Sequence, residues 1–199
     1  MSSTKTRQRL AYPVTRRCDQ VDNYFGTHVA DPFRWLEDAN SAETAAWVKD
    51  ENAVTRSFVD PLPSRDTIRA RMTQLWDFEK FGSPSKHGER TFYYHNSGLQ
   101  NQYVLFVVDT PDAQPRVLLD PNTLSADGTV ALSGTSTTKD GSLMAYSISR
   151  AGSDWQEWHV RDVATGNDLP DVIMWSKFSG ASWLKDNSGF FYSRYAEPS

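Results

Sequence analysis

The feature that most constrains the fold of this chain is an internal repeat. Residues 139–147 (KDGSLMAYS) match residues 185–193 (KDNSGFFYS), with Lys, Asp, Ser, Tyr and Ser at the same places. Each copy begins with a tight turn, because Gly and Asn tolerate positive φ and Asp caps its own backbone, and continues as a strand. A fainter copy ends at residues 92–94. A unit of short strands that recurs every 40–50 residues or so is typical of a β-propeller blade.

A second strand of the unit recurs as well. Residues 105–109 (LFVVD) parallel residues 158–162 (WHVRD), and each run leads into a polar turn. One blade then begins near residue 80 and another near residue 130, and a third is cut off soon after Tyr192. Propellers close with about four to eight blades. We therefore expect an incomplete β-propeller, and we do not expect residue 199 to be a natural domain end.

The chain divides into three parts. Residues 1–10 are polar and without periodicity, which predicts a disordered tail. Residues 11–79 form an arm followed by two helices, and residues 80–199 carry the alternating β pattern. The fold class is therefore mainly β with an N-terminal α-helical arm.

The two helices are predicted from capping and spacing. Asn40 and Glu43 form a capping box at the start of the first helix. Its apolar face carries Trp47, Val54 and Phe58. Two prolines end this helix, and Ser64 caps a second one over about residues 65–76.

Composition excludes several classes of protein. The net charge is −4 and no basic stripe is present, so a nucleic-acid partner is not expected. No run approaches the roughly 20 apolar residues of a membrane span, and the first ten residues lack a secretory pattern. Cys18 is the single cysteine and fits a reducing compartment. We expect a cytoplasmic protein. The 13% of aromatic residues indicates a packed core or an interface.

No catalytic apparatus is evident from the residues themselves. A Gly-x-Ser-x-Gly nucleophile motif is absent, and residues 134–138 (GTSTT) are interpreted as a Ser/Thr-rich loop. The four histidines are not spaced as metal ligands, so no metal and no cofactor are expected. His95 and His159 fall in strand patterns and are interpreted as sheet-surface residues. Glu37 and Asp38 precede a helix and suit capping roles.

Several segments resemble the prolyl oligopeptidases. Residues 22–38 (DNYFGTHVADPFRWLED) closely resemble the opening of that family, and a helix with its W-V-x-x-x-N pattern follows at residues 47–52. The turn at residues 152–155 (GSDW) and the segments 169–171 (LPD) and 177–179 (KFS) are also similar to the family. The resemblance covers nearly the whole chain after residue 11.

This resemblance implies an architecture and an activity. The arm and helices would wrap onto a C-terminal α/β-hydrolase domain that carries a Ser-Asp-His triad, and that domain is missing from these 199 residues. The chain would hold the first two blades and part of a third of a seven-bladed propeller, which admits only short peptides. The intact protein would be a serine endopeptidase that cleaves short proline-containing peptides on the carboxyl side of proline. The chain alone would be inactive and would contribute no catalytic residue.

Two substrate-binding residues are implied by position. Phe178 would be an aromatic wall of the substrate pocket, with a place in the blade core as the alternative. Asp154 would pair with a substrate-binding Arg of the hydrolase domain, with a turn cap beside Trp155 as the alternative; Trp155 itself is interpreted as a packing residue. A non-enzymatic β-propeller interaction module is the alternative function, and the reading frame after Ser199 distinguishes the two.

Overall fold

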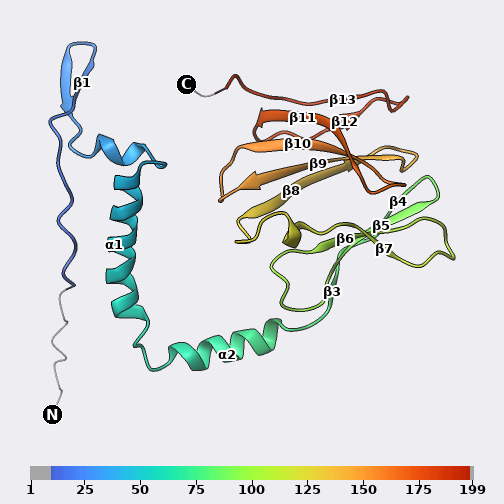
Figure 1. Ribbon diagram of the computed structural model, residues 1–199, viewed down its shortest axis with the longest axis horizontal. Coiled ribbons are helices and arrows are strands. Elements are labelled where there is room, and N and C mark those ends of the chain that lie inside the picture. The colour runs from blue at the N-terminus through green and yellow to red at the C-terminus, as the bar shows by residue number, and fades with distance from the viewer. Residues whose placement is uncertain (1–9, 198–199) are drawn as a thin grey trace. The chain divides into compact units, whose positions relative to one another are not determined.

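The computed structural model describes residues 10–197, so the predicted tail lies, except for Leu10, outside the described residues. The chain forms two compact units, of which the first ends at Met72 and the second begins at Thr73 (Figure 1). In the described part of the chain no helix is both long and apolar enough to cross a membrane.

The first unit begins with a β-hairpin and continues into helices. Its elements are strands β1 (Val21–Tyr24) and β2 (Thr27–Ala30), a 3-10 helix (Arg34–Glu37), α1 (Ala42–Val59) and α2 (Arg65–Trp76), the last of which runs into the second unit. The hairpin turn holds Phe25 at φ 53°, and the backbone N–H of Gly26 donates to Asn23 Oδ1 over 2.7 Å. The predicted range of the second helix, 65–76, is confirmed.

The first helix is capped one residue later than its sequence predicts. Ser41 is the N-cap, and its hydroxyl oxygen accepts the backbone N–H of Thr44 over 3.1 Å. The prediction of a capping box from Asn40 to Glu43 is wrong, because the Asn40 N–H donates to Asp38 Oδ1 over 3.1 Å and Glu43 pairs with Arg16 instead. A short Ser side chain next to the helix reaches the orphan amide directly.

The second unit consists of antiparallel sheets joined in chain order. The first sheet has the order β3-β5-β6-β7, and β4 also pairs with β5 on the side of β3. Its strands are β3 (Lys80–Phe81), β4 (Ser85–His87), β5 (Arg90–Asn96), β6 (Val104–Val108) and β7 (Arg116–Leu119). A short 3-10 helix (Pro121–Thr123) leads to the next sheet.

The second sheet has the order β11-β10-β9-β8, and a two-stranded sheet follows it. The strands are β8 (Val130–Thr137), β9 (Leu143–Arg150), β10 (Gln156–Asp162), β11 (Asp168–Ser176), β12 (Ser182–Trp183) and β13 (Phe190–Phe191). The expectation of a mainly β chain with two N-terminal helices is thereby confirmed. The interpretation of residues 134–138 as a loop is wrong, since residues 134–137 belong to β8 and pair with the buried strand β9.

The turns of the repeat have the geometry that their sequence predicts. Asp140 Oδ1 accepts the backbone N–H of Ser142 over 3.0 Å, and Asp186 Oδ1 accepts that of Ser188 over 3.1 Å. The residue after each Asp, Gly141 or Asn187, has a positive φ, of 74° and 61°. The two copies therefore form the same turn, each leading into the next strand of its sheet.

A hydrophobic core lies between the first and second sheets. Met144, Val107 and Val163 are completely buried there. The core cluster as a whole consists of Phe92, Leu105, Val107, Leu118, Leu119, Val130, Met144, Tyr146, Ile148 and Val163. Because β5 alternates between two faces, Phe92 and Tyr94 point to this core while Tyr93 and His95 occupy the opposite face.

Candidate functional site

Loops from successive sheets meet at one edge of the second unit. The β5–β6 loop (residues 97–103) and the β9–β10 loop (residues 151–155) each leave the second strand of their repeat. Val130, at the start of β8, pairs with Arg150 at the end of β9. In the repeat, residues 177–180 correspond in sequence to residues 131–134 of β8. We call this edge, formed by residues 97–103, 130–134, 151–155 and 177–180, the loop edge.

Phe178 lies on the loop edge with its side chain exposed. The residue is 77% exposed, so it does not belong to the packed core of the described chain. Its φ is 50°, a left-handed conformation that costs free energy in a residue with a Cβ and that recurs at functional sites. The ammonium of Lys177 lies 5.4 Å from the centroid of its ring.

Trp155 packs in a cluster of aromatic rings. Its ring is edge-on to Trp175 at 5.8 Å and to Tyr195 at 5.7 Å. Lys177 Nζ lies 4.9 Å from the Trp155 centroid, so one ammonium contacts both Trp155 and Phe178. This is the packing role that the sequence predicts for Trp155.

Asp154 occupies an exposed turn on the same edge. The turn is capped by Ser153, whose hydroxyl oxygen accepts the Trp155 N–H over 3.1 Å and whose own N–H donates to Arg150 O over 2.9 Å. Ala151 and Gly152 both have positive φ. Within residues 10–197 the Asp154 carboxylate has neither a hydrogen bond nor an ion pair. Ser153 therefore caps the turn, and Asp154 is presented outward without a partner in this chain.

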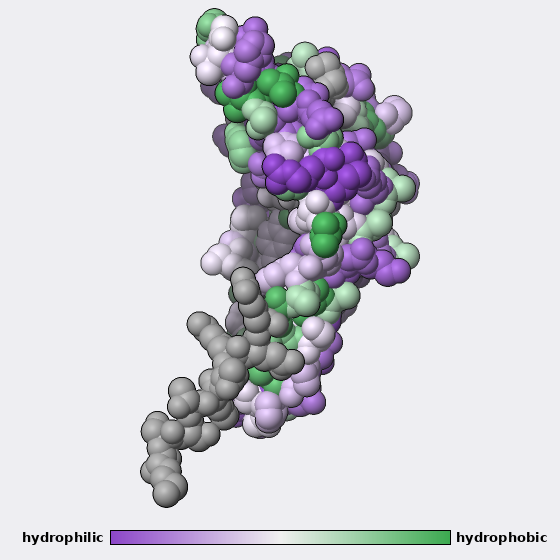
Figure 2. Space-filling view, turned by 90° about the vertical axis from the view of Figure 1, so that its left-hand side faces the viewer, coloured by the Kyte–Doolittle hydropathy of each residue, from purple (hydrophilic) through white to green (hydrophobic). Residues whose placement is uncertain are grey.

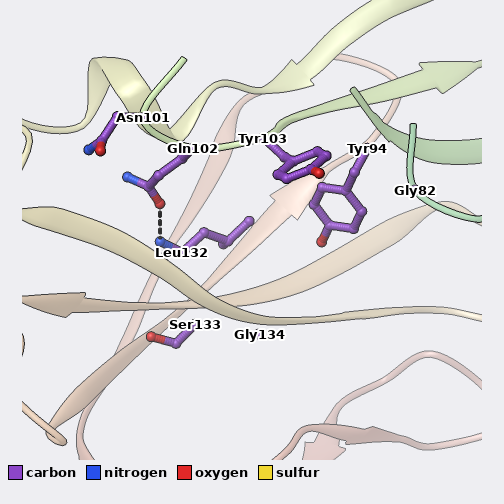
Figure 3. Close-up of a pocket in the computed structure, with 8 residues that line it drawn as sticks. All are labelled: Gly82, Tyr94, Asn101, Gln102, Tyr103, Leu132, Ser133 and Gly134. Atoms are coloured by element: carbon purple, nitrogen blue, oxygen red, sulfur yellow. Dashed lines mark hydrogen bonds between the residues drawn. The ribbon is translucent and has the colours of Figure 1, made fainter. Parts of the chain in front are cut away.

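A cavity of about 550 Å³ opens on the loop edge between the first and second sheets (Figure 3). Its lining consists of Gly82, Tyr94, Asn101, Gln102, Tyr103, Leu132, Ser133 and Gly134. The Gln102 side chain joins the two sheets: its amide donates to Val130 O over 2.7 Å and accepts the Leu132 N–H over 2.9 Å. None of the sequence features described above predicts this cavity. The signal was in the repeat, which extends upstream so that residues 132–134 (LSG) match residues 178–180 (FSG).

Within the second unit, the strongly perturbed ionisable groups lie away from the loop edge. Hydrogen bonds from Arg116 and then Arg90 lower the pKa of Asp109 to about 2. Burial, followed by its hydrogen bond to Asp168, raises the pKa of Tyr146. Arg116 also donates to Val163 O over 2.6 Å and so bridges the first sheet to the second. These groups hold strands and sheets together, and they do not mark a reactive centre.

The histidines do not contribute to a catalytic constellation. His87 Nδ1 lies 3.2 Å from Thr138 O, His95 pairs with Glu79 and His159 with Glu157. His95 and His159 are half-buried in strands, as predicted. Across residues 10–197 no histidine hydrogen-bonds to a serine or cysteine side chain, and no three His, Cys, Asp or Glu residues group as metal ligands.

Comparisons with known proteins agree with this architecture. Residues 13–199 match the family model described as prolyl oligopeptidase, N-terminal beta-propeller domain. The chain is 42% identical over 196 residues to the prolyl endopeptidase of Elizabethkingia meningoseptica, covering 98% of this chain and 28% of that protein. It is 35% identical to prolyl oligopeptidase A of Amanita bisporigera, and the match covers 98% of this chain and 29% of that protein.

Solved structures give the same result. A structure from a study of two prolyl endopeptidases superimposes with a TM-score of 0.81 at 34% identity, covering 95% of this chain and 28% of that one. Prolyl oligopeptidase B of Galerina marginata, bound to a 35-residue substrate, superimposes with a TM-score of 0.75 at 30% identity, covering 94% and 30%. The chain thus spans less than a third of the length of these relatives. With its repeated sheets and its arm, it belongs to the prolyl oligopeptidase family, where it matches the N-terminal β-propeller domain.

Proposed function

We propose that this chain is the N-terminal arm and the first blades of a serine endopeptidase that cleaves short peptides on the carboxyl side of proline. Two complete sheets and a third, shorter one would be the first two blades and part of a third of a seven-bladed propeller. The propeller would gate access to a Ser-Asp-His triad in a C-terminal α/β-hydrolase domain. The observation that carries this proposal is that the loop edge presents both an exposed Phe178 ring and the unpaired carboxylate of Asp154.

The chemistry of the loop edge suits this role. An exposed aromatic face is a wall against which a proline ring or another apolar side chain can be buried, which is worth about 1–2 kcal/mol. An outward carboxylate without a partner can accept a bidentate, charge-assisted hydrogen bond from an Arg of another domain. Asp154 would hold that Arg in position to bind substrate, and Phe178 would line the pocket beside it.

The first unit supports the presence of a docking partner. Several of its large apolar side chains are exposed, namely Tyr12, Val14, Tyr24, Phe25, Val48, Phe58, Ile68 and Met72. Figure 2 shows hydrophobic residues in green in several places on one side of the molecule, among hydrophilic ones in purple. Such exposure is typical of a surface that is covered in the complete protein. We propose that the hydrolase domain covers this surface. The boundary near residue 80, between the arm with its two helices and the partial propeller, stays a prediction.

The test uses the protein encoded by the complete reading frame and a chromogenic Gly-Pro substrate. Phe178→Ala should raise KM about tenfold, which corresponds to about 1.4 kcal/mol of lost binding. Phe191→Ala is the matched control, since Phe191 is 72% exposed in β13 but lies away from the loop edge. Equal kinetics for the two variants would remove Phe178 from the substrate pocket.

A second experiment tests whether the 199-residue chain has peptidase activity without the rest of the protein. The 199-residue chain alone should not hydrolyse the Gly-Pro substrate, whereas the complete protein should. Turnover by the isolated chain would contradict the proposal. A reading frame that stops directly after Ser199 would also contradict it and would favour the non-enzymatic interaction module.

A further inference from the structure

We propose that the cavity between Tyr94, Tyr103 and strand β8 is a second peptide subsite, which binds a proline or another compact apolar residue several positions from the scissile bond. This inference rests on the proposed peptidase function and adds to it a site one repeat away from Phe178. It concerns only residues of the second unit.

The walls of the cavity have the composition of a proline-binding groove. Tyr94 and Tyr103 lie close together in its lining, and Ser133 and Gly134 lie on the strand across from them (Figure 3). Grooves lined by aromatic rings bind proline-rich segments, because the extended polyproline conformation is preformed and loses little entropy on binding. No charged side chain lines the cavity, so a neutral apolar residue suits it better than an ionic one.

One wall of the cavity is held in place before any ligand arrives. The hydroxyl of Tyr94 is 2.9 Å from Thr135 Oγ1 of β8, which holds that ring in place. Gly82 leaves room over the same ring, since a Cβ at this position would lie 3.2 Å from Tyr94 Cβ. Tyr103, by contrast, is 40% exposed and can cover an incoming side chain. A rigid wall and an exposed ring are an arrangement that binds at low entropic cost.

The position of the cavity in the repeat points to substrate. Leu132, Ser133 and Gly134 correspond to Phe178, Ser179 and Gly180 in the next copy. β8 is an edge strand of its sheet, and its pairing with β9 shifts register between Leu132 and Gly134, which turns Ser133 outward. The cavity is therefore lined by the residues of the second sheet that correspond in the repeat to Phe178 and its neighbours, which lead into the third sheet.

The separation of the two sites sets the length of peptide required. Packed sheets lie about 10 Å apart, and an extended chain advances about 3.3 Å per residue. A peptide whose proline contacts Phe178 would therefore reach the cavity with a residue about three positions away. A Gly-Pro substrate is too short to fill both sites, which makes it an internal reference for the test.

The experiment compares short and long substrates of the complete protein. Heptapeptides carry the cleaved proline and, three positions before or after it, either a second proline or a glycine. We expect the second proline to raise kcat/KM about fivefold on at least one side. Tyr103→Ala and Leu132→Ala, each of which removes a side chain that lines the cavity, should abolish this gain while leaving Gly-Pro hydrolysis unchanged.

Leu99→Ala is the matched control, because Leu99 is exposed on the same loop but does not line the cavity. The proposal is overturned if wild-type protein shows no gain, if the gain survives in both variants, or if both variants slow Gly-Pro hydrolysis equally, since that would indicate docking of another domain. Calorimetric titration with the two-proline heptapeptide separates this failure from failure of the proposed function: binding that depends on Tyr103 without any turnover supports the subsite and contradicts only the peptidase.

Discussion

At the scale of single residues, backbone strain is concentrated on the loop edge. Five non-glycine residues in the described chain have positive φ, and three of them, Ala151, Trp175 and Phe178, lie in or directly before that edge. Such conformations persist only where surrounding contacts hold them. Here the holding contacts are the edge-on packing of Trp155 on Trp175 and the Lys177 ammonium. The Phe178 ring is 77% exposed, as the proposed substrate-facing role requires.

The unpaired carboxylate on this edge leads to a prediction about activity. In the complete protein, Asp154→Asn should lower kcat/KM on the Gly-Pro substrate about tenfold, because a neutral amide loses most of a charge-assisted hydrogen bond to an Arg. Steady-state kinetics at two ionic strengths measures the change. Asp171→Asn, at another exposed position, is the control. Identical kinetics for both variants would remove Asp154 from the interface with the hydrolase domain.

A second residue-scale prediction concerns pH. Hydrogen bonds from the backbone of Ser142 and then the hydroxyl of Thr138 lower the pKa of Asp140 to about 2. A carboxyl whose pKa is lower in the folded state stabilises it fully above its unfolded pKa of about 4, and this contribution disappears as the pH falls towards 2. Asp140→Ala should therefore lower the free energy of unfolding by about 1 kcal/mol at pH 7. The difference from wild type should shrink between pH 4 and pH 2.

Urea unfolding of the protein at a series of pH values measures this difference. Asp112→Ala is the control, since Asp112 is exposed and has no hydrogen-bond partner within residues 10–197. A stability difference for Asp140→Ala that is constant with pH would show that the loss comes from the side chain's packing and not from its charge.

At the scale of elements, the turns of successive sheets bind one another. Arg90, after the first turn, donates to Gly141 O over 3.0 Å, and Asn187 in the third turn donates to Asp140 Oδ2 over 2.8 Å. The three turns thus form a continuous column at the edge opposite the loop edge. Gly141 belongs to this column, and a Cβ added at this position would lie only 2.6 Å from His87 O. The column joins the three sheets at this edge.

Two glycines with the same backbone conformation test the importance of the column. Gly141 has φ 74° and Gly166 has φ 73°, but nothing lies within 4 Å of a Cβ at Gly166. Gly166→Ala should cost about 1 kcal/mol from left-handed strain alone. Gly141→Ala should cost roughly 1–3 kcal/mol more, because the neighbouring turn must move. Urea unfolding measures both variants, and equal losses would show that the turns do not depend on each other.

At the scale of the whole molecule, the first sheet leaves one aromatic face open. Tyr93 stacks on Phe106 with centroids 5.5 Å apart, and Phe81 stacks on His95 at 4.6 Å. Phe81 is 62% exposed, and Val117, which pairs with Phe106 across the strands, is also exposed. An exposed apolar face of this kind normally has a partner. In a closed propeller it would be the next sheet around the ring.

The open face predicts how the 199-residue chain behaves by itself. We expect concentration-dependent self-association, because exposed sheet faces and edges pair between molecules. Phe81→Lys should reduce it, since burying an unpaired ammonium opposes contact. Sedimentation velocity over a range of concentrations gives the assembly state. Leu99→Lys, outside this face, controls for the added charge; a monomeric wild-type chain, or equal effects of both variants, would contradict the prediction.

Much of the fold could be predicted because its determinants are local. The repeat turns depend on Asp side chains that bond to the backbone two residues on, and the second helix is predicted from Ser64 and the two prolines before it; the structure confirms both. Asn40 and Ser41 are equally good N-caps by type, and only the path of the chain decides between them. Strand β8 was misinterpreted because its Ser/Thr-rich sequence is typical of a loop; its pairing with the buried strand β9 overrides that preference.

By itself, the sequence determined the family, the mainly β architecture and the position of Phe178 and Asp154 in a motif, since all of these are patterns along the chain. Only the tertiary structure showed that the turns form a column, that Lys177 contacts both Trp155 and Phe178, and that Tyr94, Tyr103 and Leu132 line one cavity. The physical reason is that these contacts join residues from different strands and loops. Their distances depend on how the sheets pack, and no local pattern encodes that packing.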